Sequence, residues 1–199
     1  MKYYLKKSLF LIVYLLFTAT IAASILSIEG LAVLKLILLI ANLALFLYIS
    51  CGITFQDGQK AYKVLVSNDK LRERIVETGE EITLNTKEEY HVKKGFIIGA
   101  LACVPMVLLL IVHAIVTNSN PENIVFGQAA GVLYMNVYGF FNVDFLNVQS
   151  VVLYASFYWA LLAIPLLIVA QGVSYYLGAR KIMFQQEQIK NTHQRIYGK

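Results

Sequence analysis

The sequence predicts an all-α membrane protein, a bundle of four transmembrane helices. Three observations predict this fold: 58% of the 199 residues are hydrophobic, they concentrate in four long runs, and the charged residues fall between those runs. A soluble domain is usually about 45–50% apolar, and a helix needs about 20 mostly apolar residues to cross a bilayer. The spans predicted on this basis cover residues 8–28, 31–53, 95–117 and 154–176.

These four runs are expected to be helical because hydrocarbon offers no partner to a free backbone group. The alternative is four buried helices of a soluble bundle, but such helices carry polar stripes for their solvated faces. The runs contain a single charged residue, Lys35. The apolar stretch of the first run, about 20 residues, is longer than the 7–15 residues of a signal peptide. We therefore expect the first run to remain a membrane helix.

The distribution of cations predicts the orientation in the membrane. The chain has 17 Lys and Arg, and only Lys35 lies outside the N-terminus, the 54–94 loop and the 177–199 tail. The two other connections hold only the acids Glu29, Glu122 and Asp144. The positive-inside rule then places both termini in the cytoplasm, and we expect a bacterial plasma membrane. The basic excess (pI ≈ 9.1) is thus a signal of topology and of contact with the lipid bilayer. No nucleic-acid partner is expected.

The cytoplasmic loop, residues 54–94, is predicted to form a small helical lobe. A helix is expected to continue from the second span to Thr78, although the turn-forming run 67–69 could interrupt it. Gly79 follows where a helix C′ glycine belongs. Residues 86–89 (Thr-Lys-Glu-Glu) fit a capping box, which predicts a new helix running unbroken into the third span.

The outer segment, residues 118–153, begins polar and then becomes apolar and aromatic. It is too short and too polar to span. Residues 124–149 could lie at the membrane surface as an amphipathic helix or re-enter the bundle. We favour the surface location because a re-entrant backbone needs burial in protein.

The 177–199 tail is predicted to be a basic helix. Its Ile182, Ile189 and Ile196 recur every seven residues. Such a helix suits an anionic leaflet or a partner helix.

Small residues at a spacing of four form two candidate packing ridges. The ridges are Ala19, Ala23 and Ser27 in the first span, and Gly95, Gly99 and Cys103 in the third. Small side chains let helix backbones approach closely in lipid. We favour packing within the chain, with a homo-oligomer as the alternative.

Four polar residues within spans are candidate functional positions, since polar groups in hydrocarbon are costly. They are Lys35, Asn42, His113 and Gln171. Lys35 is near enough to the outer boundary to extend its ammonium group to water, with Glu29 or Asp144 as a partner. His113 and Gln171 are expected to reach water near the span ends. Asn42 lies mid-span and needs a partner from another helix.

Two stretches carry a family resemblance. Residues 89–99 (EYHVKKGFIIG) and 175–181 (YYLGARK) resemble stretches of small, uncharacterised four-span bacterial integral membrane proteins. The resemblance implies the four-span layout and no particular activity.

The sequence predicts no catalytic, cofactor-binding or metal-binding residues, because it lacks the motifs that carry such chemistry. The expected function is that of a non-enzymatic accessory, assembly or regulatory membrane subunit. Its protein partner would bind the 54–94 loop or the C-terminal tail. One alternative is an oligomeric channel or small-solute transporter component, suggested by Pro105 and Pro165 within spans. A second is a lipid-acting membrane enzyme using Lys35, His91 and His113.

Overall fold

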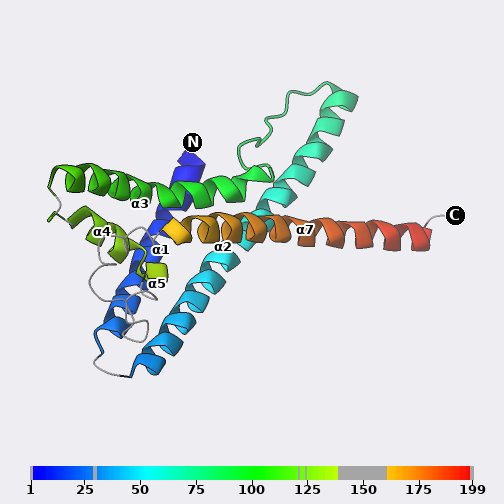
Figure 1. Ribbon diagram of the computed structural model, residues 1–199. Helices are drawn as coiled ribbons and strands as arrows, with labels where there is room; N and C mark the ends of the chain where they lie inside the picture. Colours follow the sequence, from blue (N-terminus) through cyan, green and yellow to red (C-terminus); the bar gives the residue numbers. More distant parts are fainter. Residues whose placement is uncertain (1, 29–30, 121, 124, 139–160, 198–199) are drawn as a thin grey trace.

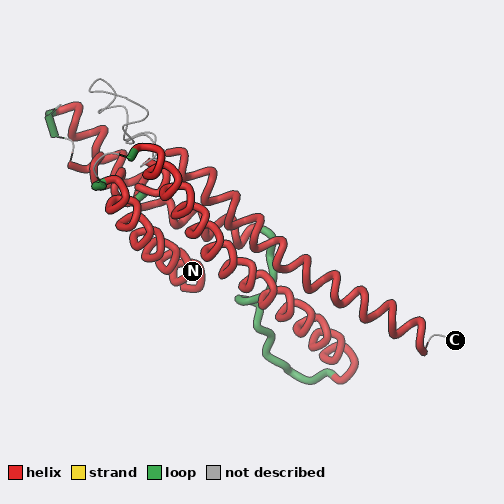
Figure 2. Tube along the Cα trace, turned by 90° about the horizontal axis from the view of Figure 1, so that it is seen from below, coloured by secondary structure: helices red, strands yellow, loops and turns green. Residues whose placement is uncertain are grey.

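The structure, a computed structural model, describes residues 2–28, 31–120, 122–123, 125–138 and 161–197. These residues form helices and connections, with no strand in the described part of the chain (Figures 1 and 2). In chain order the helices are α1 (Lys2–Leu26), α2 (Ala32–Thr78), α3 (Lys93–Ser119), α4 (Val125–Leu133), α5 (Met135–Tyr138) and α7 (Ala163–Tyr197).

Three of the helices, α1, α2 and α3, are long and apolar enough to cross a membrane. The all-helical class and these three apolar helices are therefore confirmed. The predicted fourth span begins outside the described residues, and its later part is the apolar beginning of α7. Pro105 lies inside α3, whereas Pro165 is in the first described turn of α7. A first turn tolerates proline because its N–H groups have no partner within the helix.

The outer surface of the bundle is apolar, as expected for helices surrounded by hydrocarbon. Large exposed side chains on α1, α2 and α3 include Leu9, Phe17, Ile37, Leu108 and Ile115. A smaller apolar core lies inside, where side chains of α1, α2, α3, α4 and α7 meet and Met135 of α5 packs against them. Its buried members are Leu15, Phe46, Cys103, Met106, Leu110, Ala130, Leu133, Tyr134, Ala163 and Leu167.

Helix α2 runs without a break through residues 67–69, so the predicted interruption there is wrong. Asn68 is buried, and its side-chain amide donates to the carbonyl oxygen of Asn85, 3.1 Å away. The Asn68 side chain thus binds the 79–92 connection. It does not form the local hydrogen bonds to its own backbone that would interrupt α2. The predicted helix end is confirmed: Gly79 has φ 69°, and its N–H donates to Ile75.

The predicted capping box is also wrong, because α3 begins at Lys93 and residues 86–88 form turns. The carboxylate of Glu89, which would complete the box, is bound instead by both terminal nitrogens of Arg72 at 2.9 Å. The ammonium group of Lys94 donates to the carbonyl oxygens of Lys87 and Glu89. The 79–92 connection is thus held to α2 and to the start of α3 as non-helical chain.

The described part of the outer segment packs one face of α4 against the bundle, while Val125 and Val132 on its other face are 63% and 50% exposed. The surface location that we favour therefore stays a prediction. Ala130 of α4 is fully buried, and Tyr134 and Asn136 are 2% and 3% exposed. The Tyr134 hydroxyl donates to the carbonyl oxygen of Ala102, within α3. Small residues on α4 permit this close approach. Residues 121, 124 and 139–153 of the outer segment lie outside the described part of the chain.

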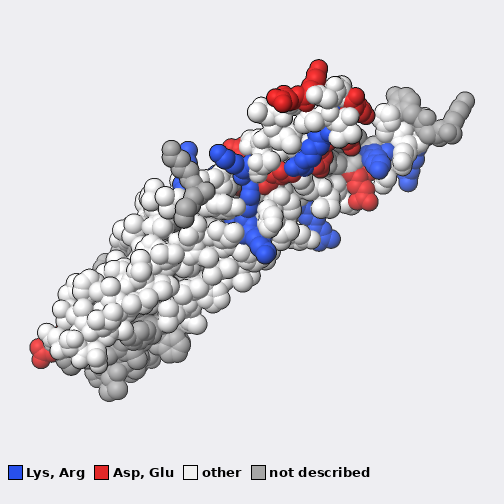
Figure 3. All heavy atoms as spheres, turned by 90° about the horizontal axis from the view of Figure 1, so that it is seen from above, with Lys and Arg blue, Asp and Glu red and all other residues white. Residues whose placement is uncertain are grey.

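Charge and apolar surface separate along the molecule. On the face seen in Figure 3, one half is almost bare of charged side chains and the other half carries both signs. The second half of α7 extends away from the other helices toward the C-terminus (Figure 1). The predicted helix in the tail is confirmed as far as Tyr197.

Candidate functional site

A buried network of neutral polar groups joins α1, α2 and α5. The Asn42 amide nitrogen donates to the Thr18 carbonyl oxygen at 3.0 Å and to the Asn136 side-chain oxygen at 2.7 Å. The Asn136 amide donates to the Thr18 hydroxyl at 2.7 Å. All three residues are at most 5% exposed. Asn42 thus finds partners on two neighbouring elements, and the network fixes α5 against α1 and α2.

A second buried network joins α2 to α7. The Thr54 hydroxyl donates to the Gln171 side-chain oxygen, and the Gln171 amide donates to the Ser50 hydroxyl at 3.2 Å. Gln171 is fully buried. The expectation that it reaches water is therefore wrong, because its amide is satisfied by two hydroxyl side chains of the facing helix.

A partly buried ion pair lies next along α2. Asp57, 8% exposed, accepts from the ammonium group of Lys7 in α1 at 2.7–2.8 Å. Sequence reasoning missed Asp57 because it lies beyond the predicted end of the second span. The sequence carries a signal: Asn42, Ser50, Thr54 and Asp57 are separated by eight, four and three positions, so they share one face of a helix. The buried residues of α2 form a stripe along the same face. The residues of this stripe are Leu39, Asn42, Phe46, Ser50, Thr54, Asp57 and Ala61.

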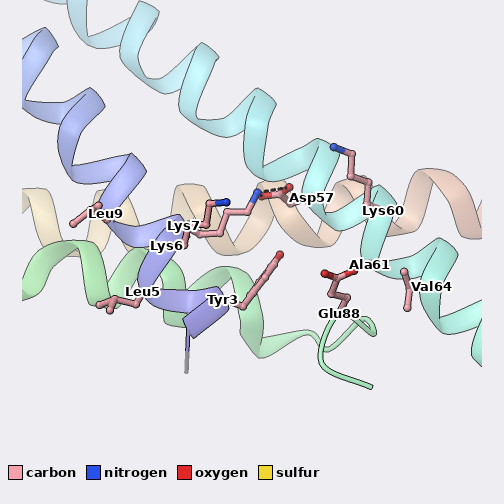
Figure 4. A pocket seen from close by; sticks show the side chains of 10 residues that line it. All are labelled: Tyr3, Leu5, Lys6, Lys7, Leu9, Asp57, Lys60, Ala61, Val64 and Glu88. Atoms are coloured by element: carbon pink, nitrogen blue, oxygen red, sulfur yellow. Dashed lines mark hydrogen bonds and ion pairs between the residues drawn. The ribbon is translucent and has the colours of Figure 1, made fainter. Parts of the chain in front are cut away.

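Two neighbouring hollows lie beside this ion pair and share lining residues, and together we call them the α1–α2 cleft. Both are lined by Lys6, Lys7 and Asp57. The outer hollow, about 800 Å³, adds Tyr3, Leu5, Leu9, Lys60, Ala61, Val64 and Glu88 (Figure 4). The inner hollow, about 280 Å³, adds Phe10, Leu11, Tyr14, Ser50, Ile53, Thr54 and Ile98. The cleft is therefore charged at its mouth and mainly apolar in its interior.

Tyrosine side chains close the charged end of the bundle near the cleft. The ring of Tyr90 stacks on that of Tyr175 at 5.6 Å and meets that of Tyr62 edge-on at 5.8 Å. Burial raises the pKa of the Tyr90 phenol above its ordinary value. The Lys94 ammonium group lies 5.6 Å from the centre of the Tyr3 ring, a cation–π distance. These contacts hold the 79–92 connection, α1 and α7 together at one end.

The first predicted ridge is only partly buried: Ala19 is 1% exposed, Ala23 is half-buried and Ser27 is exposed. The second ridge lies against α7. A β-carbon added to Gly99 would lie 2.9 Å from the Cα atom of Ile168, and one on Gly95 would lie 2.6 Å from the Cβ atom of Tyr175. Both glycines therefore serve packing within the chain, and self-association through them stays a prediction.

Lys35 and His113 are both more buried than predicted, at 6% and 2% exposed. The predicted partners of Lys35, Glu29 and Asp144, lie outside the described residues. His91 and His113 are at opposite ends of α3, so the structure does not bring together the three residues considered for a lipid enzyme. Within the described ranges, no group of three or more His, Cys, Asp and Glu could hold a metal ion.

The fold and the cleft together define a class: an all-helical protein with helices long and apolar enough to cross a membrane. Comparison with protein-family models, with curated proteins and with solved structures finds no match to this chain. Its function must therefore be argued from its own residues.

Proposed function

We propose that this protein is a four-span membrane protein that acts through contacts, as an accessory, assembly or regulatory subunit. The observation that carries the proposal is the α7 arm, residues 183–197, which extends beyond the bundle (Figure 1). Its large apolar side chains are exposed: Phe184 is 59%, Ile189 67% and Ile196 66% exposed. Apolar surface displayed on a projecting helix marks an interaction site.

The pattern of the α7 arm favours a helical protein partner. Ile182, Ile189 and Ile196 recur every seven residues, the spacing at which one helix presents a seam to another. Ile182 is already buried against the bundle, whereas the next two isoleucines are exposed. The adjacent Lys190 and Arg195 would favour a partner with acidic residues beside its apolar face. A partner helix would thus extend the packing that the bundle begins.

The proposed orientation has both termini in the cytoplasm. Its support is the Lys7–Asp57 ion pair, which joins the first turns of α1 to the part of α2 that continues past the apolar span. The N-terminus and the 54–94 loop therefore share one end of the bundle. That end is rich in lysine and arginine, as cytoplasmic loops are.

The test is purification of the full chain from native membranes after mild cross-linking, followed by mass spectrometry. The test variant is Ile189→Glu/Ile196→Glu. The control is Asn191→Glu/Gln194→Glu, which adds the same charge to exposed positions about half a turn away around the helix. We expect one stoichiometric partner with the native chain and the control, and its loss with the test variant. Recovery of the native chain alone, or retention of the partner by the test variant, contradicts the proposal.

A further inference from the structure

We propose that the α1–α2 cleft binds one anionic phospholipid, with its phosphate at the mouth and an acyl chain in the inner hollow. This goes beyond the proposed function, since it requires no protein partner. It requires only that α1 and α2 stand in a bilayer.

The shape of the cleft suits a ligand with one polar end and one apolar end. The hollows measure about 800 Å³ and about 280 Å³, and binding sites for small molecules typically measure about 300–1,000 Å³. The charged residues Lys60 and Glu88 line only the outer hollow, and the Lys7–Asp57 pair lies where both hollows share lining. The rest of the inner hollow is mainly apolar. A headgroup therefore fits outside and a hydrocarbon chain inside.

The surroundings of the cleft indicate a lipid. The side chains of Leu5, Leu9 and Phe10, which line it from α1, are 64%, 60% and 55% exposed. In a bilayer these side chains face hydrocarbon. An empty void would forfeit the dispersion contacts that an acyl chain supplies. The cleft is thus open to the bilayer, where lipid molecules are its nearest neighbours.

The charges at the mouth select a phosphate. Lys6, Lys7 and Lys60 line the outer hollow together with the carboxylates of Asp57 and Glu88 (Figure 4). Asp57 is paired with Lys7, and Glu88 accepts a hydrogen bond from Asn85 at 3.0 Å. Lys6 and Lys60 are exposed. Their flexible side chains, each carrying three donors, can converge on a phosphate held between α1 and α2.

The floor of the cleft gives the site a fixed position. Ser50, Thr54 and Asp57 line the inner hollow, and each is nearly fully buried. The first two are fixed by hydrogen bonds within the α2–α7 network, and the third by Lys7. These buried side chains, fixed by hydrogen bonds and an ion pair, distinguish the cleft from a general basic patch at the membrane surface.

The experiment uses the full chain, purified in non-ionic detergent and stripped of lipid, with bound lipid counted by native mass spectrometry. Phosphatidylglycerol and phosphatidylcholine of identical acyl chains are titrated in parallel. We expect one phosphatidylglycerol per chain, bound at least tenfold more tightly than phosphatidylcholine. Equal binding of the two lipids overturns the proposal. Inorganic phosphate is added as a third arm, and displacement of the lipid by phosphate alone would show a site for free anions instead.

Variants locate the lipid. Lys6→Gln/Lys60→Gln should lower the affinity for phosphatidylglycerol at least fivefold. The control, Lys70→Gln/Lys190→Gln, removes the same charge from exposed positions outside the cleft lining and should leave it unchanged. An equal loss in both variants means general electrostatic attraction, which refutes the site. Ile53→Trp fills the inner hollow without altering charge and should weaken binding of both lipids. Unchanged binding by this variant excludes the acyl chain from the inner hollow, provided that its melting temperature is native.

Discussion

Gly58 of α2 and Gly178 of α7 form a reciprocal contact between the two helices. A β-carbon on Gly58 would overlap the carbonyl oxygen of Tyr175, and one on Gly178 would overlap the carbonyl oxygen of Phe55. Each glycine thus receives the backbone of the opposite helix, where no other residue fits. Gly58 directly follows Asp57 in α2, so this crossing lies next to the Lys7–Asp57 pair along that helix.

Gly58→Ala and Gly178→Ala should each destabilise the protein, by about 1–3 kcal/mol, because overpacking forces the helices apart. The control is Gly52→Ala in the same helix, where nothing lies within 4 Å of the added carbon. It should be neutral or stabilising, by up to about 1 kcal/mol, from helix propensity. Denaturant-induced unfolding in detergent measures all three. Equal effects at positions 52 and 58 would show that the close crossing does not exist in solution.

Removal of Lys7 and removal of Asp57 should lower the free energy of unfolding by different amounts. Lys7→Gln leaves a carboxylate unpaired whose side chain is only 10% exposed, whereas Asp57→Asn leaves an ammonium group whose side chain is 31% exposed and can turn to water. We expect the free energy of unfolding to fall by about 2–4 kcal/mol for Lys7→Gln and by about 1 kcal/mol for Asp57→Asn. Breaking a fully buried pair costs about 3–5 kcal/mol, and the values expected here are lower because water reaches Lys7.

The double variant Lys7→Gln/Asp57→Asn serves as the check on this pair. It should cost less than the sum of the two single variants, since neither charge is left without its partner. Strict additivity in unfolding measurements would mean that the two side chains do not interact.

The Thr18–Asn136 hydrogen bond can be measured by a double-mutant cycle with Thr18→Val and Asn136→Leu. Hydrogen bonds between side chains in membrane helices contribute about 0.6 kcal/mol on average and up to about 1.7 kcal/mol. We expect a coupling energy within that range. A coupling energy of zero would place α5 away from α1.

The 79–92 connection should loosen in acid. The hydrogen bonds from Arg72 hold the pKa of the Glu89 carboxyl below its ordinary value of 4.5. The contact is therefore fully present above pH 4.5 and is lost as the pH falls through the lowered pKa of the folded protein. Hydrogen exchange of residues 80–92 should accelerate over that interval.

Glu89→Gln is the control for this acid effect. It should exchange rapidly already at neutral pH and show a weaker acid dependence, since its side chain no longer titrates. Exchange in the native chain that is independent of pH below 4.5, once corrected for intrinsic rates, would exclude the Arg72–Glu89 contact as the anchor.

The sequence alone was sufficient to predict the helices that depend on the length of an apolar run, and the helix end that depends on a glycine. Long apolar runs predicted α1, α2 and α3, and Gly79 predicted the end of α2, because hydrophobic length and glycine conformation are local properties. The polar partners could not be predicted in this way. Asn136, which bonds Asn42, lies 94 residues from it in the chain.

The errors have the same origin. The capping box at residues 86–89 was locally sound, but Arg72 takes the carboxylate of Glu89 from 17 residues away. Asp57 escaped notice because it follows the apolar run of the second span and its partner, Lys7, is 50 residues away in the chain. In each case a tertiary contact outweighed a local preference.

The most direct test of the account is cysteine accessibility in intact cells, using a membrane-impermeant maleimide on a variant without Cys51 and Cys103. Single cysteines replace Ser67 and Gln188 at the charged end, and Ser27 and Ser119 at the opposite end; all four positions are exposed. The account predicts labelling of Ser27→Cys and Ser119→Cys in intact cells, and of Ser67→Cys and Gln188→Cys only after permeabilisation. Labelling of Ser67→Cys from outside intact cells would contradict it.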